Sequence, residues 1–117
     1  DMTTGVQNVM IGALAGKDNT IGDGNVEIGY EAGETNTLGD KNVLIGYQAG
    51  KNFGTGAASD NNVAIGFKAG MGSGYTDANY NVFIGHQAGI DATSGDSNVG
   101  LGFNSLFELK GGRIQWY

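Results

Sequence analysis

Pairs of β-branched residues, two positions apart, recur along the chain behind an asparagine and ahead of a glycine. The resulting pattern, N-V-x-I-G, opens nine-residue segments at Asn8–Gly16, Asn25–Gly33, Asn42–Gly50, Asn62–Gly70 and Asn81–Gly89, with a degenerate sixth copy at Asn98–Leu106. Successive copies start 17, 17, 20, 19 and 17 residues apart. A period of this length is typical of a solenoid, in which one small supersecondary unit stacks on itself.

Each copy predicts a short β-strand. Residues two apart in an extended chain share one face, so we expect the valine and isoleucine to point together into a thin core. The residue between them ranges from Glu27 to Phe83, and a position that accepts such different side chains is expected to point outward. A helix is disfavoured because most copies hold two glycines, each of which costs about 1 kcal/mol in a helix interior.

The predicted structural repeat consists of the asparagine, the two apolar residues and the glycine of each copy. These residues are Asn8, Val9, Ile11, Gly12, Asn25, Val26, Ile28, Gly29, Asn42, Val43, Ile45, Gly46, Asn62, Val63, Ile65, Gly66, Asn81, Val82, Ile84, Gly85, Asn98, Val99, Leu101 and Gly102. Polar segments rich in glycine and aspartate separate the copies and predict tight corners. One coil is therefore expected to contain a short strand, a turn at its Ala-Gly step, a second short extended segment and a return corner.

The predicted fold is all-β: a parallel β-roll, or solenoid, of about six coils over residues 1–106, forming a rod on the order of 30 Å tall. Stacking would place the motif asparagines above one another, as a ladder of side-chain amides that bond from coil to coil. The two longer spacings come from Phe53–Asn61 and Met71–Tyr80, which we expect to bulge outward as loops. Residues 107–117 are interpreted as a hairpin with a glycine turn, which caps the roll or joins it to a following module.

The composition limits the partners of such a roll. Twelve acidic residues against six basic ones give a net charge of -6 and an isoelectric point near 4.4. Nucleic acid and anionic membrane surfaces are disfavoured, since both attract basic proteins. The chain has no cysteine for a disulfide or a thiolate metal site. It also has no apolar run approaching the roughly 20 residues of a membrane-spanning helix.

The motif resembles repeats of two related groups of proteins. N-V-x-I-G is similar to the head repeat of YadA-like trimeric autotransporter adhesins, and the fuller unit N-V-x-I-G-Y-x-A-G is more similar to repeats of bacteriophage tail fibres. The resemblance covers Asn8 to about Leu106, and the 17- to 20-residue period favours the tail fibres. It implies a left-handed parallel β-roll, assembly as a homotrimer, and an adhesive or host-recognition role on a virion or extracellular surface.

A trimer is also expected from the small size of the predicted core. Each coil offers few apolar side chains to its interior, which is marginal for a chain of 117 residues. A column of larger side chains follows the motif glycine, and burying it against two sister chains would supply the missing apolar area. The candidate trimer-seam residues are Tyr30, Tyr47, Phe67, His86 and Phe103. Packing inside the roll and a carbohydrate-stacking platform are the alternatives for these rings.

Other patterns suggest chemistry only weakly. The repeated Gly-Asp-x-Asn corners could offer oxygen ligands to calcium, but turn formation explains them better. Glu27, Glu31 and Glu34 could include a hydrolytic carboxylate pair, yet a narrow convex roll offers no cleft, and a solvated acidic face is favoured. The threonines lack the regular array of an ice-binding face. An ion held by three copies of His86 at a threefold axis is a minor alternative to a packed ring. We therefore assign no catalytic, cofactor-binding or metal-binding residue.

The sequence favours a structural and adhesive segment of a trimeric fibre, most similar to a phage tail fibre. Its expected partner is itself, with a host-surface glycan or protein as a further candidate ligand. The second hypothesis is the head of a bacterial trimeric autotransporter adhesin, and the third is a polysaccharide-degrading spike. We expect no partnership with nucleic acid and no insertion of this segment into a membrane.

Overall fold

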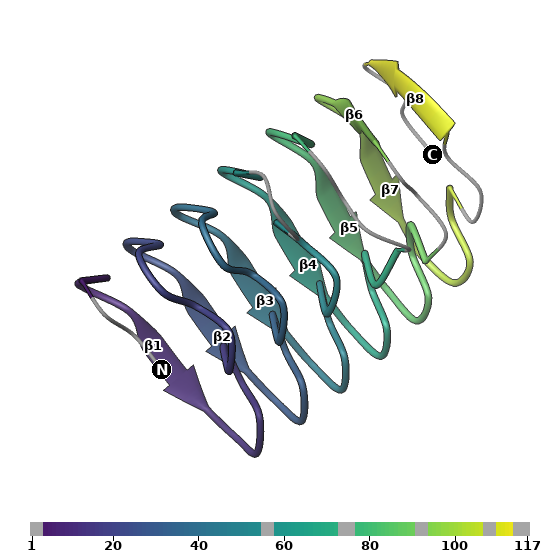
Figure 1. Cartoon of the computed structure of the whole chain (residues 1–117). Helices are drawn as coiled ribbons and strands as arrows, with labels where there is room; N and C mark the ends of the chain where they lie inside the picture. The colour runs from purple at the N-terminus through teal and green to yellow at the C-terminus, as the bar shows by residue number, and fades with distance from the viewer. Residues whose placement is uncertain (1–3, 55–57, 73–76, 91–93, 107–109, 114–117) are drawn as a thin grey trace.

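The computed structural model describes residues 4–54, 58–72, 77–90, 94–106 and 110–113, which form an all-β solenoid of about five turns, without a helix in these ranges. One parallel sheet has the strand order β1-β2-β3-β4-β5-β7, and a second sheet pairs β6 with β8. The strands are β1 (Val9–Ile11), β2 (Val26–Ile28), β3 (Val43–Ile45), β4 (Val63–Ile65), β5 (Val82–Ile84), β6 (Ser94–Asp96), β7 (Val99–Leu101) and β8 (Lys110–Arg113). Figure 1 shows a stack of narrow coils that climbs from the N-terminus to the C-terminus.

The repeat sets the register of the main sheet. Val26 pairs with Val9 on one side and with Val43 on the other, and the motif isoleucines pair in the same way. This register continues to β7 although the third and fourth repeats are longer than the others. The molecule measures 36 × 22 × 20 Å along its principal axes, with the strands stacked as parallel rungs (Figure 1). The predicted rod of parallel coils is therefore confirmed.

The motif glycine is required where each strand ends. Gly46 has a φ of 132°, which a residue with a side chain rarely adopts. A Cβ added to Gly46 would lie 2.6 Å from the carbonyl oxygen of Gly66 in the next repeat. Gly102 differs because a Cβ added there would have no atom within 4 Å. The neighbouring repeat thus excludes a side chain at Gly46 on steric grounds, in addition to the backbone conformation.

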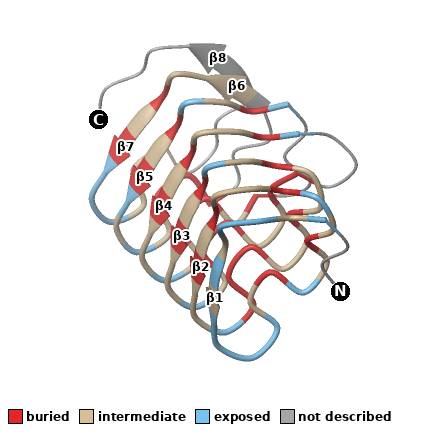
Figure 2. Cartoon of the chain, turned by 90° about the vertical axis from the view of Figure 1, so that its left-hand side faces the viewer, coloured by how far each residue is buried: buried red, intermediate tan, exposed pale blue. Residues whose placement is uncertain are grey.

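The face of the sheet that points into the core is the opposite of the predicted one. The middle residue of β2, β3, β4, β5 and β7 is buried, whereas the flanking residues are half-buried or exposed (Figure 2). Leu44, for example, is fully buried between the half-buried Val43 and Ile45. The reason is the motif asparagine: Asn42 is buried at the corner before the strand, and the residue two positions later shares its face. The prediction that the valines and isoleucines form the core is wrong.

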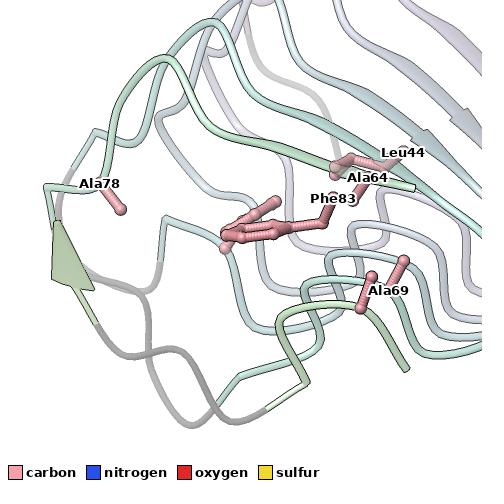
Figure 3. Packing of buried hydrophobic residues seen from close by; sticks show 7 residues of the cluster. Leu44, Ala64, Ala69, Ala78 and Phe83 are labelled. Atoms are coloured by element: carbon pink, nitrogen blue, oxygen red, sulfur yellow. The ribbon is translucent and has the colours of Figure 1, made fainter. Parts of the chain in front are cut away.

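The core lies between the inner side of the sheet and the turns that face it. In the third to fifth repeats it is an apolar cluster, whose buried members are Leu44, Phe53, Ala64, Ala69, Ala78, Phe83 and Ala88, and the partly buried Leu106 of the sixth repeat packs against it. Figure 3 shows Phe83 reaching from the sheet into this interior, with Ala78 beyond it. Large and small residues alternate along the inner face from Leu44 to Ala64 to Phe83. Complementary packing of neighbouring repeats explains why the middle position varies so widely in size.

One prediction of local structure is confirmed in a single repeat, and another is wrong. The second extended segment forms a strand at β6, whereas the corresponding parts of the other described repeats are not strands. The glycines of β8 belong to a strand that pairs in parallel with β6, whereas the prediction placed them in the turn of an antiparallel hairpin. The role of residues 107–117 as a cap or junction stays a prediction, because 107–109 and 114–117 lie outside the described residues.

The two insertions contribute to the interior at their boundaries. Phe53, the first residue of the first expected loop, is fully buried, and so are Ser59 and Ala78. Phe53 therefore belongs to the core and not to a surface loop. The predicted outward bulges fall on residues 55–57 and 73–76, which lie outside the described residues.

Candidate functional site

The outer face of the main sheet is the candidate functional site. A ladder of asparagines fixes the corner before each strand of this sheet. Oδ1 of Asn25 accepts the main-chain N–H of Asn42 at 2.9 Å, while Nδ2 of Asn25 donates to the carbonyl of Gly39 at 2.7 Å. Equivalent main-chain bonds link the motif asparagines of all six repeats. The predicted asparagine ladder is confirmed. Because these side chains are held inward, the valine that follows each of them points outward.

A second ladder, which was not predicted, uses the acidic corners. Oδ1 of Asp40 accepts the main-chain N–H of Asp23 in the preceding repeat at 2.7 Å, and Asp60 accepts from Asp40 at 2.8 Å. Asn79 and Asp96 continue the series. The aspartates thus serve as acceptors for main-chain N–H groups, which supports turn formation over calcium binding. Among the described residues, no group of three or more His, Asp or Glu side chains is arranged to hold a metal ion.

Three columns of uncharged side chains cover the outer face, and we call them together the outer strip. They hold the motif valines, the motif isoleucines with Leu101, and the rings that follow the motif glycine. Ile28, Ile45 and Ile65 are half-buried by their neighbours in the stack, whereas Ile11 is 59% and Leu101 54% exposed. The strip therefore runs along the whole described stack. Sequence reasoning missed the aliphatic columns as surface residues because it assigned the wrong face to the interior.

The candidate seam residues form one continuous aromatic stack in the outer strip. The ring centroids are separated by 5.3 Å between Tyr30 and Tyr47, 5.2 Å between Tyr47 and Phe67, 4.9 Å between Phe67 and His86, and 5.2 Å between His86 and Phe103. The interplanar angles lie between 9° and 23°. All five residues are exposed. The stack thus lies outside the solenoid, on the face opposite the core, and packing of these rings inside the roll is excluded.

The stack leaves ring edges, not ring faces, open to solvent. Tyr47, Phe67 and His86 each have a ring on both sides, so both of their faces are covered. Sugars stack on the flat faces of aromatic rings, and a column that presents edges is poorly suited to that mode of binding. Phe103 is the last ring of the stack, and its exposed fraction of 72% reflects a face without a neighbouring ring in the described residues. The geometry therefore disfavours the carbohydrate platform along most of the column.

A cluster of charged groups borders the stack near Tyr30. Oε2 of Glu31 accepts hydrogen bonds from Nζ of Lys51 at 2.7 Å and Nε2 of Gln48 at 2.6 Å. These bonds lower the pKa of Glu31, and the same contact raises the pKa of Lys51. Lys51 also lies 3.4 Å from Glu34. A hydrogen bond with Glu31 raises the pKa of Tyr30, which links this cluster to the end of the aromatic stack.

Glu27 occupies a different environment from the other two glutamates of its repeat. It is the middle residue of β2 and is fully buried, so the expectation of an outward, solvated Glu27 is wrong. Glu31 and Glu34 lie on the corner with Lys51, and the three carboxylates do not share a cleft. No pocket is found in the described part of the chain. The alternation of side chains along a strand would have shown that Glu27 points inward, because it lies two residues after the inward Asn25.

Comparisons with known proteins do not assign the chain to a family. No family model matches the chain, and neither the curated proteins nor the solved structures include a significant match. Within the described ranges, no helix is long and apolar enough to span a membrane.

Proposed function

We propose that the chain is a structural and adhesive segment of a trimeric fibre, similar to a bacteriophage tail fibre, in which six left-handed coils from each of three copies meet through the outer strip. The observation that carries this proposal is the bare apolar face of an all-parallel sheet. Parallel sheets are normally covered on both faces. Here the chain's own turns cover the inner face, and the outer strip faces solvent.

A sister chain is the partner that best fits the strip. The strip follows the long axis of the rod, so its partner must be equally long and must repeat at the same spacing. Another copy of the chain meets both conditions, and three copies around a common axis would cover all three strips with a closed symmetry. The strip carries no Asp, Glu, Lys or Arg, so its burial avoids the desolvation penalty of charged groups.

The mass of the assembled protein tests the trimer. We expect light scattering after size exclusion to give about three times the chain mass of 12.0 kDa. Phe67→Asp places a charge in the middle of the aromatic stack and should shift the mass towards that of one chain, with β-rich circular dichroism retained. Lys41→Asn is the matched control, because Lys41 lies outside the strip and Asn61 stands at the equivalent position of the next repeat. A wild-type chain of 12.0 kDa at all concentrations would contradict the proposal.

The adhesive part of the proposal rests on the resemblance to fibre repeats. It is tested by the binding of fluorescently labelled trimer to intact bacterial cells, with and without periodate oxidation of surface glycans. Binding that periodate abolishes supports a glycan ligand, and binding that resists periodate supports a protein ligand. A trimer that binds no bacterial surface at any concentration would leave a purely structural segment.

A further inference from the structure

The interior of the second repeat is polar, in contrast to the apolar cluster of the later ones, and that of the first combines Met10 with the fully buried Asn19. The positions that face each other across the core are the middle strand residue and the residue eleven places after the motif asparagine. In the third repeat this pair is Leu44 and Phe53, both fully buried. In the second repeat it is Glu27 and Asn36, which are also fully buried. A carboxyl group therefore occupies a place that is otherwise filled by hydrocarbon.

The carboxyl of Glu27 is enclosed and only half satisfied. Nδ2 of Asn36 donates to Oε1 at 2.8 Å, and Oδ1 of Asn36 accepts the N–H of Gly39 at 3.0 Å. Oε2 has no hydrogen-bond partner among the residues that the structure describes. A Cβ added to Gly16 would overlap Oε2, and one added to Gly33 would overlap Oε1. The backbones of two repeats thus close around the carboxyl group.

The charged residues of the adjoining segments do not offset a negative charge at this place. The nearby lysines are already paired with other carboxylates, Lys17 with Glu34, and Lys51 with both Glu31 and Glu34. The remaining charged residues of the neighbouring turns, Asp18, Asp23, Asp40 and Lys41, are half-buried or exposed, whereas Glu27 is fully buried. An ionised carboxylate buried without a cation is far more costly than a neutral carboxyl group. Burial accordingly raises the pKa of Glu27 to about 7, against the opposing hydrogen bond from Asn36.

We propose that Glu27 is a proton-binding site in the core that makes the attachment of the first two repeats to the rod dependent on pH. With the proton bound, the carboxyl group is neutral and the first two repeats pack on the third. When the proton leaves, the charge is relieved by separation of the second repeat from its neighbours, which admits water to the carboxylate. The apolar cluster from Leu44 onward holds the remaining repeats together in both states. This inference is independent of the trimer.

The direction of the pH dependence follows from the two protonation states of Glu27. The pKa of Glu27 is raised from an ordinary 4.5 in the open form to about 7 in the closed form, so the closed form binds the proton more tightly. Closure is therefore strongest below pH 4.5, weakens as the pH rises towards 7, and changes little above that. These two values correspond to a roughly 70-fold rise in the opening equilibrium constant between pH 5 and pH 8.

Amide hydrogen exchange tests the proposal in the intact chain. After correction for the intrinsic pH dependence of exchange, the reporters are the amides of Gly29 and Glu31, which donate to the first repeat, and those of Gly66 and Gln87, which donate between later repeats. We expect protection of the first pair to fall by roughly 70-fold from pH 5 to pH 8, with the second pair nearly constant. Equal loss in both pairs, or no loss in the first, would overturn the proposal.

Matched variants keep the test decisive. Glu27→Gln keeps the shape of the side chain without its charge and should abolish the pH response of the first pair. Glu34→Gln removes a carboxylate from the same repeat and should leave the response intact. If Glu27→Gln does not fold, the double change Glu27→Leu with Asn36→Phe reproduces the pair of the third repeat and should also remove the response. A full response in either Glu27 variant would overturn the proposal.

Discussion

Asn42 forms hydrogen bonds with the motif asparagines of both neighbouring repeats, through its main-chain N–H on one side and its side-chain oxygen on the other. Its N–H donates to Oδ1 of Asn25 at 2.9 Å, and its own Oδ1 accepts the N–H of Asn62 at 2.9 Å. Nδ2 of Asn42 donates to the carbonyl of Ser59 at 2.7 Å. The residue is fully buried, so none of these groups has water as a substitute partner.

Replacement of Asn42 by alanine is therefore expected to be strongly destabilising. Asn42→Ala leaves the N–H of Asn62 and the carbonyl of Ser59 without their side-chain partners in a buried place. Each unsatisfied group costs about 1–3 kcal/mol, so the free energy of unfolding should fall by about 2–6 kcal/mol. Urea denaturation followed by circular dichroism measures this change. Lys41→Asn, next to it on the surface, should change the free energy by less than about 0.5 kcal/mol. Similar small losses in both variants would contradict the role of the ladder.

The motif glycines offer a comparison between steric and conformational effects. Gly46→Ala introduces both an unfavourable φ and a Cβ 2.6 Å from a main-chain oxygen, whereas Gly102→Ala introduces only the unfavourable φ of 108°. We expect Gly102→Ala to lose about 1–3 kcal/mol of stability. Gly46→Ala should lose more, because the two repeats must also move apart. Thermal unfolding of both variants checks this order, and equal losses would show that contact between repeats does not contribute.

The orientation of the sheet is tested with single cysteines, since the natural chain contains none. Ala64→Cys places a thiol in the fully buried middle position of β4, and Ile65→Cys places one in the outer strip. The first thiol should react slowly with a maleimide at every protein concentration. The second should react much faster than the first in dilute solution and become protected as trimers form. The opposite order of rates in dilute solution would restore the original assignment of the core.

The cluster beside Tyr30 predicts a local titration. Hydrogen bonds from Lys51 and Gln48 lower the pKa of Glu31, so the stabilisation that they provide is present above the ordinary pKa of 4.5 and is lost as the pH falls through the lower folded value. Lys51→Ala removes the largest cause and should raise the pKa of Glu31 towards 4.5. Carbon-13 NMR titration of the glutamate carboxyls measures this shift. An unchanged Glu31 titration in Lys51→Ala would show that the ion pair is not formed in solution.

The repeat in the sequence predicted the strands, their parallel register and the asparagine ladder. These features depend on local spacing, and the spacing is visible in residues such as Asn25, Val26 and Gly29. The choice of the inner face was wrong because strand alternation is the same from either side, and a shift of one residue exchanges the faces. The apolar character of Val26 and Ile28 favoured the inner face for these two residues. The inward side chain of Asn25 instead places them on the outer face.

The candidate site was predictable only in part. The spacing of the rings from Tyr30 to Phe103 located the aromatic column, and the structure places it opposite the core, as a trimer seam requires. Whether sister chains cover it stays a prediction. Glu27 and its partner Asn36 were not recognised because their juxtaposition depends on which residues face each other across the interior. That relationship arises from the turns, whose conformations are not encoded in the strand pattern.

The two ladders also give the rod a direction. Asparagine oxygens accept from the following repeat and the acidic corner residues accept from the preceding one, so the two ends of any repeat are chemically different. A repeat can therefore be added or lost only in the same orientation, with its leading side against the trailing side of its neighbour. Duplication or deletion of whole repeats would change the length of the rod in steps of about 4.8 Å without altering its cross-section. Such a molecule can evolve in length while the surface along its sides is preserved.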